Sequence, residues 1–256
     1  MKVKQVNWQG AAVHTREIDP GKDYDWIVKK GELQLFEQME YIHRVALRDV
    51  SGEAPILALL VEEQAVGLLV GDLPSSRLDH GKRVIYNTLY LEFEKTEQES
   101  VLESITSLLL CTQKTYKPHQ QHFGDYAESL YAAKKAENEN ENENENTVIL
   151  PGLYKQPDFN LSPIQSNKLI LPSTPANRNR SARYVRSLEH SSTEESHFYL
   201  ISTGRVSLEK CEEVAELSEE MLLLTLSSEV ESEIDFQKGK EEGRFDKLKK
   251  LMGFNK

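Results

Sequence analysis

Three strand-length apolar runs in close succession constrain the fold of this chain more than any other feature. They cover residues 55–61, 65–70 and 84–93. Glu62-Glu63-Gln64 separates the first two runs and is short enough for a hairpin. Runs of this length, rich in Val, Ile, Leu and Tyr, are typical of strands rather than helices. The sequence therefore predicts an antiparallel sheet in the first half of the chain.

The third run alternates two kinds of residue, which predicts one buried and one half-exposed face of its strand. The face assigned to the core carries Ile85, Leu89, Leu91 and Phe93. The face expected to be half exposed carries Tyr86, Thr88, Tyr90 and Glu92.

Helices are predicted to back this sheet between residues 96 and 136. Thr96-Glu97-Gln98-Glu99 has the pattern of a capping box, and one apolar stripe follows it. Pro118 disfavours the helical conformation at the residue before it, so the first helix is expected to end near Tyr116. A second helix is expected over 121–136.

The second half of the chain alternates between low-complexity, proline-rich and apolar stretches. Residues 137–146 are a Glu-Asn run without an apolar side chain, which is typical of a solvated linker. Residues 197–202 (HFYLIS) predict a strand that joins the first sheet, and Ser207 is expected to cap a helix over 207–227.

We therefore predict an α+β protein with a mostly antiparallel sheet backed by helices. The predicted parts are an N-terminal α+β part (1–136), a linker (137–146), a C-terminal part completing the same sheet (147–228) with a basic mobile loop (156–186), and a charged helical tail (229–256). Two separate domains are the alternative arrangement.

The charge and cysteine content restrict the function classes and the compartment. The chain has 31 Lys and Arg residues against 42 Asp and Glu residues, a net charge of -11, which argues against a nucleic-acid or anionic-membrane surface over the whole protein. Cys111 and Cys211 each fall in an apolar pattern, which favours reduced, buried thiols. No secretory leader or membrane span is recognised, so the cytoplasm is expected.

A polar turn between the second and third runs is the first candidate binding site. It carries Arg77, Asp79, His80 and Arg83 directly before the apolar strand. Arginine provides a planar fork for carboxylate or phosphate groups, so the turn could bind an anionic ligand or acidic groups of a partner. The alternative is a solvated loop in which Asp79 pairs with Arg77 or Arg83.

A local basic segment is the second candidate binding site. Residues 160–188 contain no acidic residue but include Lys168 and four arginines. The arginines are Arg178, Arg180, Arg183 and Arg186. The segment could contact nucleic acid or an acidic protein surface. The alternative is that it neutralises the acidic 208–220 helix of its own chain.

The sequence contains no motif that assigns a catalytic or metal-binding site. His119, His122 and Asp125 could contribute ligands only if a further group arrived from elsewhere, so no metal is assigned. Gly81-Lys82 lacks the upstream glycine of a phosphate-binding loop, and no Gly-x-Ser-x-Gly elbow occurs. We therefore assign no catalytic residue and expect no cofactor.

The leading hypothesis is a non-enzymatic interaction or regulatory subunit of a bacterial cytoplasmic assembly, with another protein as its partner. The first alternative is a nucleic-acid-associated accessory subunit that binds through residues 168–186. The second alternative is a hydrolase whose site forms only in the folded chain.

Overall fold

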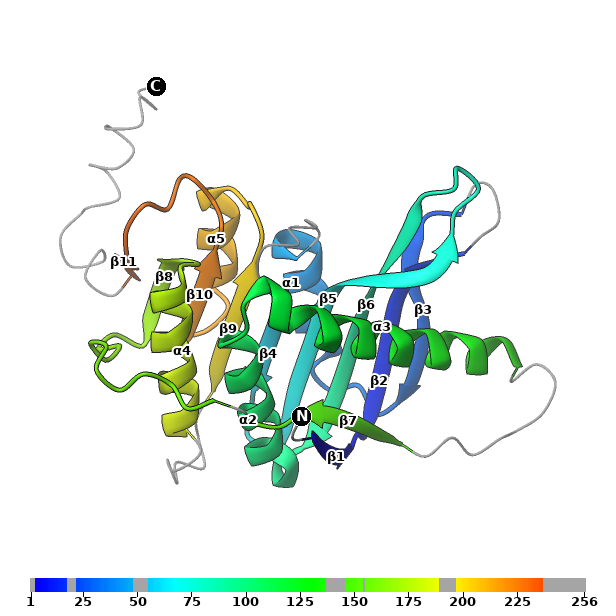
Figure 1. Cartoon of the computed structure of the whole chain (residues 1–256), viewed down its shortest axis with the longest axis horizontal. Coiled ribbons are helices and arrows are strands. Elements are labelled where there is room, and N and C mark those ends of the chain that lie inside the picture. The colour runs from blue at the N-terminus through cyan, green and yellow to red at the C-terminus, as the bar shows by residue number, and fades with distance from the viewer. Residues whose placement is uncertain are drawn as a thin grey trace.

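A computed structural model describes residues 3–17, 22–47, 55–136, 146–153, 155–188 and 197–236 (Figure 1). The strands are β1 (Val3–Asn7), β2 (Gly10–Arg16), β3 (Tyr24–Gly31), β4 (Leu57–Val61), β5 (Ala65–Leu78), β6 (Val84–Glu94), β7 (Thr147–Pro151), β8 (Lys168–Pro172), β9 (Phe198–Thr203), β10 (Met221–Thr225) and β11 (Ile234–Asp235). The helices are α1 (Phe36–Ala46), α2 (Gln98–Leu109), α3 (Gln113–Ala136), α4 (Pro175–Leu188) and α5 (Leu208–Ala215).

Nine of these strands form one mixed sheet in the order β11-β8-β10-β9-β4-β5-β6-β2-β3. Strand β10 runs parallel to both β8 and β9, and the other neighbouring pairs of this sheet are antiparallel. Strands β1 and β7 form a separate antiparallel pair. This arrangement confirms the predicted α+β class, and β9 joins the sheet beside β4.

Helices cover the sheet on both faces, which divides the core into two layers (Figure 1). One layer contains apolar residues of α2, α3 and α4, and the other contains those of α1 and α5. The central residues of β4, β5 and β9 are fully buried whichever face they occupy. Because both faces of these strands are buried, their sequences are continuous apolar runs and do not alternate between apolar and polar residues.

The prediction of a half-exposed face on β6 was wrong. Tyr90 and Glu92 are fully buried, because α1 covers that face of the sheet. The Glu92 carboxylate accepts hydrogen bonds from the backbone N–H groups of Gln34 (2.8 Å) and Leu35 (3.0 Å), where α1 begins. The Tyr90 hydroxyl also donates to Glu92. A buried carboxylate is tolerated here because the start of a helix supplies donors to it.

Two predictions for the C-terminal half were also wrong. The expected loop over 156–186 contains β8 and α4. Pro175 is the first residue of α4, where a proline costs no hydrogen bond, and Thr174 accepts from the Asn177 N–H at 3.2 Å as a cap. The expected helix over 207–227 ends at Ala215, and Met221–Thr225 forms the buried strand β10.

The helical boundaries between 96 and 136 differ from the prediction as well. Thr96 lies in a 3-10 turn, and α2 begins at Gln98 without a side-chain cap. Helix α3 begins at Gln113 and continues through Pro118. The Thr112 N–H donates to the Thr115 hydroxyl at 2.9 Å, and the Thr115 N–H donates to the Thr112 hydroxyl at 3.3 Å. These bonds stabilise the start of α3 before the proline.

The Glu-Asn run (apart from Asn146) and the tail beyond residue 236 lie outside the described residues. Within the described ranges, no helix combines the length and the apolar character that crossing a bilayer requires.

Candidate interaction site

The hairpin of β5 and β6 extends beyond its neighbours to form an arm. Strand β5 pairs with β4 only as far as Val70, and after an irregularity its pairing with β6 resumes at Leu73 and Asn87. We call residues 73–87 the β5–β6 arm. It projects past the helices at one end of the sheet, together with the ends of β2 and β3 (Figure 1).

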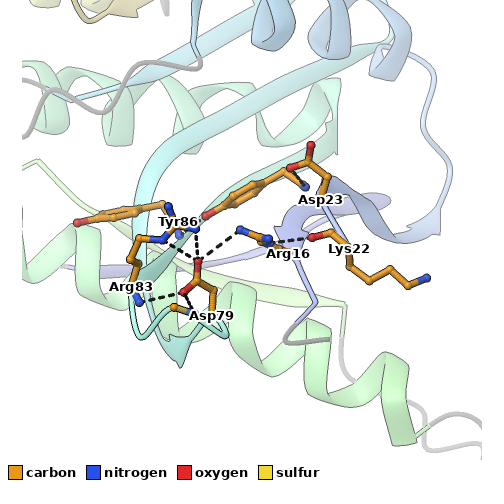
Figure 2. Close-up of polar contacts among 8 residues, drawn as sticks. Arg16, Lys22, Asp23, Asp79, Arg83 and Tyr86 are labelled. Carbon is orange, nitrogen blue, oxygen red and sulfur yellow. Dashed lines mark hydrogen bonds and ion pairs between the residues drawn. The ribbon is translucent and has the colours of Figure 1, made fainter. Parts of the chain in front are cut away.

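Asp79 holds the turn at the tip of this arm (Figure 2). One carboxylate oxygen accepts from the N–H groups of Gly81 (2.8 Å) and Arg83 (3.0 Å), and the other accepts from the Arg83 Nε (2.9 Å). Arg16 of β2 is a further donor at 3.4 Å. Hydrogen bonds from the Arg83 backbone and side chain lower the pKa of Asp79 to about 2. The turn is therefore fixed by an ionised carboxylate at neutral pH.

Arg77 points inward and anchors the arm to α3 one residue before the tip. Its guanidinium donates to Glu128 at 2.8 Å and to the hydroxyl of Thr15 at 2.6 Å, and it lies 3.9 Å from the centre of the Tyr131 ring. Burial alone would raise the pKa of Glu128, but hydrogen bonds from Arg77, Ser75 and Asn87 outweigh it and lower the pKa. Arg77 is thus a structural anchor rather than a surface ligand.

The remaining residues of the tip face solvent. His80, Lys82 and Arg83 are exposed, and the Arg83 side chain is 72% accessible even though it binds Asp79. Leu78 and Val84 pair across the two strands and are 47% and 43% exposed. The tip therefore combines a cationic turn with an exposed aliphatic pair on a fixed backbone.

The edge strand β3 borders this tip. The Tyr24 hydroxyl accepts from the Tyr86 N–H at 3.2 Å (Figure 2), which holds the beginning of β3 against the arm. The Tyr24 ring is 38% exposed and stacks on His14 with ring centres 5.7 Å apart. It adds a partly exposed aromatic ring at the edge strand that borders the arm.

The second predicted site lies elsewhere, on α4 near the opposite end of the sheet (Figure 1). Arg180 forms an ion pair with Glu233 at 3.0 Å and donates to the Ser162 carbonyl at 3.1 Å. Arg183 donates to the carbonyls of Phe159 and Leu161, at 3.1 and 2.9 Å. These arginines therefore hold the segment before β8 in place.

The other two arginines of α4 are also partly buried. Burial lowers the pKa of Arg178, and Arg186 acts electrostatically on Glu103 of α2. Of the acidic segment 208–220, residues 208–215 form α5, which packs in the other layer of the core, whereas Glu220 acts electrostatically on Tyr184 of α4. The structure thus separates the two sets of predicted site residues.

The residues considered as metal ligands make other contacts. A ring nitrogen of His122 is 2.8 Å from the Ile149 carbonyl, and Asp125 accepts from Gln121. His119 is 3% exposed, and burial, followed by the charge of His122, lowers its pKa. Across the ranges that the structure describes, no group of three or more His, Cys, Asp or Glu residues is arranged to hold a metal.

A pocket of about 190 Å³ at the root of the arm was missed by the sequence reasoning. Asp72 and Pro74 of β5, Tyr86 of β6, and Tyr116 and Gln120 of α3 contribute to its lining. The Gly71-Asp72 pair was a local signal of a break in the strand, but the contribution of α3 is not visible in sequence.

Comparison with known proteins adds no family to this description, because no protein-family model and no curated protein sequence matches the chain. The fold and the site define an α+β protein with a projecting, cation-tipped hairpin.

Proposed function

We propose that this protein is a non-enzymatic interaction or regulatory subunit of a bacterial cytoplasmic assembly, and that the tip of the β5–β6 arm docks on a partner protein. One observation carries this proposal. Leu78 and Val84 are exposed side by side next to Lys82 and Arg83 on a turn that Asp79 holds rigid.

The chemistry of the tip favours a partner protein with an apolar recess bordered by carboxylates. Burial of the aliphatic pair on docking would remove apolar surface from water, and Lys82 and Arg83 would contribute charge complementarity at the rim. Two aliphatic side chains form no hydrogen bond or ion pair with a phosphate backbone. The net charge of -11 also opposes the approach of the protein to a polyanion.

The rigidity of the turn supports the same function. A loop that is already ordered loses less conformational entropy when it binds than a flexible loop does. Asp79 orders the backbone from Gly81 to Arg83 without a partner present. The tip is therefore organised for docking in the free protein.

Crosslinking followed by affinity measurement tests this proposal. A photo-crosslinking residue at position 84 should capture one discrete protein in the native host, whereas the same residue at position 149, where Ile149 is 44% exposed on β7, should not. The captured protein, once purified, should bind Val84→Asp about tenfold more weakly than the unmodified chain.

Val3→Asp is the matched control, because Val3 is 52% exposed on β1 and lies outside the arm. It should bind the purified partner as the unmodified chain does. Equal affinities for Val84→Asp and Val3→Asp, or identical crosslinks from positions 84 and 149, would exclude the tip as the docking site.

The second candidate is a nucleic-acid-associated accessory subunit that binds through residues 168–186, and the exposed Phe159 favours it. This ring is 60% exposed and lies 5.3 Å from the Arg183 guanidinium, an arrangement that can stack a base. Phe159→Ala should then weaken binding of labelled single-stranded RNA, measured by fluorescence anisotropy at several salt concentrations. Leu217→Ala, at a 38% exposed position, is the control. Unchanged RNA affinity in Phe159→Ala would reject this candidate.

A further inference from the structure

Strand β3 forms one edge of the nine-stranded sheet (Figure 1). It has eight residues and, within the described part of the chain, pairs with β2 alone. The strand at the opposite edge, β11, has only two residues. A long edge strand presents backbone N–H and C=O groups to which a further strand can bind. Of the two described edges, β3 is therefore the one with the length to accept another strand.

Two aspartates occupy backbone donors at the beginning of this strand. The Tyr24 N–H donates to the Asp23 carboxylate at 2.8 Å, and the Trp26 N–H donates to the Asp25 carboxylate at 2.7 Å. A local side-chain acceptor of this kind takes the place that the carbonyl of a neighbouring strand would otherwise have. Trp26 and Val28 are buried, so the strand itself is firmly packed in the sheet. The edge is thus ordered, and its donors are held by acceptors that another strand can replace.

The charges of β3 are divided between its two ends. Asp25 is exposed near the beginning, whereas Lys29 is exposed near the end and is followed by Lys30. Ile27 lies between them and packs against the core. The Lys29 ammonium group lies 4.5 Å from the centre of the Phe36 ring. A strand that is acidic at one end and basic at the other is complementary to a second copy of itself running in the opposite direction.

Two-fold symmetry makes this complementarity count twice. In a symmetric dimer the same surface of both copies is used, so every contact occurs in two equivalent places. With the axis near Ile27, Asp25 of each copy lies next to Lys29 and Lys30 of the other. Opposite charges that face one another directly or diagonally across antiparallel strands stabilise the pair, whereas like charges destabilise it. A parallel pairing in register would bring like charges together and is disfavoured.

We infer that this protein forms a two-fold dimer in which β3 of each copy pairs antiparallel with β3 of the other. The sheet then continues from one copy into the next. The Trp26 N–H accepts a backbone carbonyl of the second copy as its new partner, and the Asp25 carboxylate becomes available to the lysines across the axis. An ammonium group has three donors, so Lys30 can keep the interactions it makes within its own chain.

The dimer is independent of the docking function of the tip. Strand β3 meets the arm at Tyr24, whose hydroxyl accepts from the Tyr86 N–H. Tyr24 is the first residue of the strand, so an antiparallel pairing places the arms of the two copies at opposite ends of the dimer. Both tips remain open to a partner protein.

Analytical ultracentrifugation of the full chain over a concentration series tests the dimer. The chain should pass from monomer to dimer with a Kd in the micromolar range. Added salt should weaken the association, because the charges at the edge are exposed. A chain that stays monomeric at millimolar concentration would overturn the inference and would leave the lysines as protection of the edge against other strands.

Charge reversal tests the pairing of the two strands. Asp25→Lys should raise the Kd about tenfold or more, because it places lysines of the two copies together. The double variant Lys29→Asp and Lys30→Asp should do the same by placing carboxylates together. An equimolar mixture of the two variants should form a mixed dimer, since each contact again joins opposite charges. A mixture that associates no better than either variant alone would overturn the inference.

Two further variants separate strand pairing from net charge and from folding. Glu209→Lys makes the same change in net charge as Asp25→Lys at an exposed position of α5, and it should leave the Kd unchanged. Asp25→Asn keeps an oxygen acceptor for the Trp26 N–H, so it should retain the Tm of the unmodified chain and weaken the dimer less than Asp25→Lys does. Equal effects of Glu209→Lys and Asp25→Lys on the Kd would contradict the β3 dimer.

Crosslinking of mixed isotopes identifies the contact directly. Unlabelled and isotopically labelled chains are mixed and treated with a carbodiimide, which joins carboxylates to lysines in direct contact. Mass spectrometry should find mixed-isotope crosslinks from Asp25 to Lys29 or Lys30. If these residues are joined only within chains of the same isotope, the two β3 strands are not paired.

Discussion

Asp72 lies in β5 and Asp79 lies in the turn that follows it; both are 7% exposed, yet their surroundings differ. Asp79 accepts hydrogen bonds from Gly81, Arg83 and Arg16, and these fix the tip of the arm. Asp72 has a left-handed backbone and lies beside the Tyr116 hydroxyl, which has no partner among the described residues. The Asp79 carboxylate orders the turn, whereas Asp72 marks the point where β5 turns away from β4.

The largest expected effect comes from breaking the Arg77–Glu128 ion pair, which joins the arm to α3 between the two aspartates in sequence. Arg77→Leu leaves Glu128 without its ion-pair partner in a site where the two side chains are only 12% and 18% exposed. We expect the free energy of unfolding to fall by about 3 kcal/mol, measured by urea denaturation.

Arg77→Leu combined with Glu128→Leu should recover part of this loss, because the uncompensated charge is removed. Arg83→Leu is the control at an exposed position of the same arm, and it should cause a much smaller change. Equal effects of Arg77→Leu and Arg83→Leu would contradict the role of Arg77 as an anchor.

The next prediction disturbs the Asp72 region and spares the tip. Gly124→Ala places a Cβ 2.9 Å from the Pro74 carbonyl oxygen, so the helix or β5 must shift. We expect a loss of about 1–2 kcal/mol in the free energy of unfolding, although alanine favours helices. Asp125→Ala, at the exposed neighbouring position, should change stability by less than about 0.5 kcal/mol. A stabilised Gly124→Ala variant would show that the packing is looser than described.

A smaller, local effect is expected at the tip itself. Asp79→Asn keeps the size of the side chain but loses the charge that Arg83 and Arg16 contact. Amide hydrogen exchange of Gly81 and Arg83 should become faster, while exchange in the centre of β5 should stay unchanged. Unaltered exchange at Gly81 and Arg83 would mean that Asp79 does not order the turn.

The smallest expected effect is a change in the turn at Asp79 that appears only at acidic pH. The folded pKa of Asp79, about 2, lies below the ordinary value of 3.8, so its contribution to the turn is complete above the ordinary pKa and is lost as the pH falls through the folded one. The amide chemical shift of Gly81 should therefore be constant from neutral pH to about 4 and should change towards pH 2. A transition centred near pH 4 would contradict the low pKa.

The sequence predicted the part of the fold that depends on local patterns. Strand length and composition gave β4, β5, β6 and β9. The start of α4 was also encoded locally, by Thr174 as cap and Pro175 as first residue, but the prolines of this segment were interpreted as a loop. Strand β10 was missed because a short apolar run fits a strand and a helix equally well.

The parts that could not be predicted depend on residues far apart in the chain. Glu92 is buried because Gln34 and Leu35 supply its donors. Tyr116 and Asp72 line the same pocket only because α3 packs on β5. Asp79 and Arg83 were recognised as neighbours because they share one turn, whereas no spacing rule connects Asp72 with Tyr116.

The anchoring of the arm also has a mechanical consequence. The Arg77–Glu128 ion pair attaches the arm to α3 one residue before Leu78, and Arg16 of β2 contacts the turn at Asp79. A force applied at Val84 would act on the backbone of both strands, and the ion pair would pass part of this force to α3. Gly124 of α3 lies against the Pro74 carbonyl of β5. A force applied at the tip would therefore reach the bend at Asp72 both along β5 and through α3.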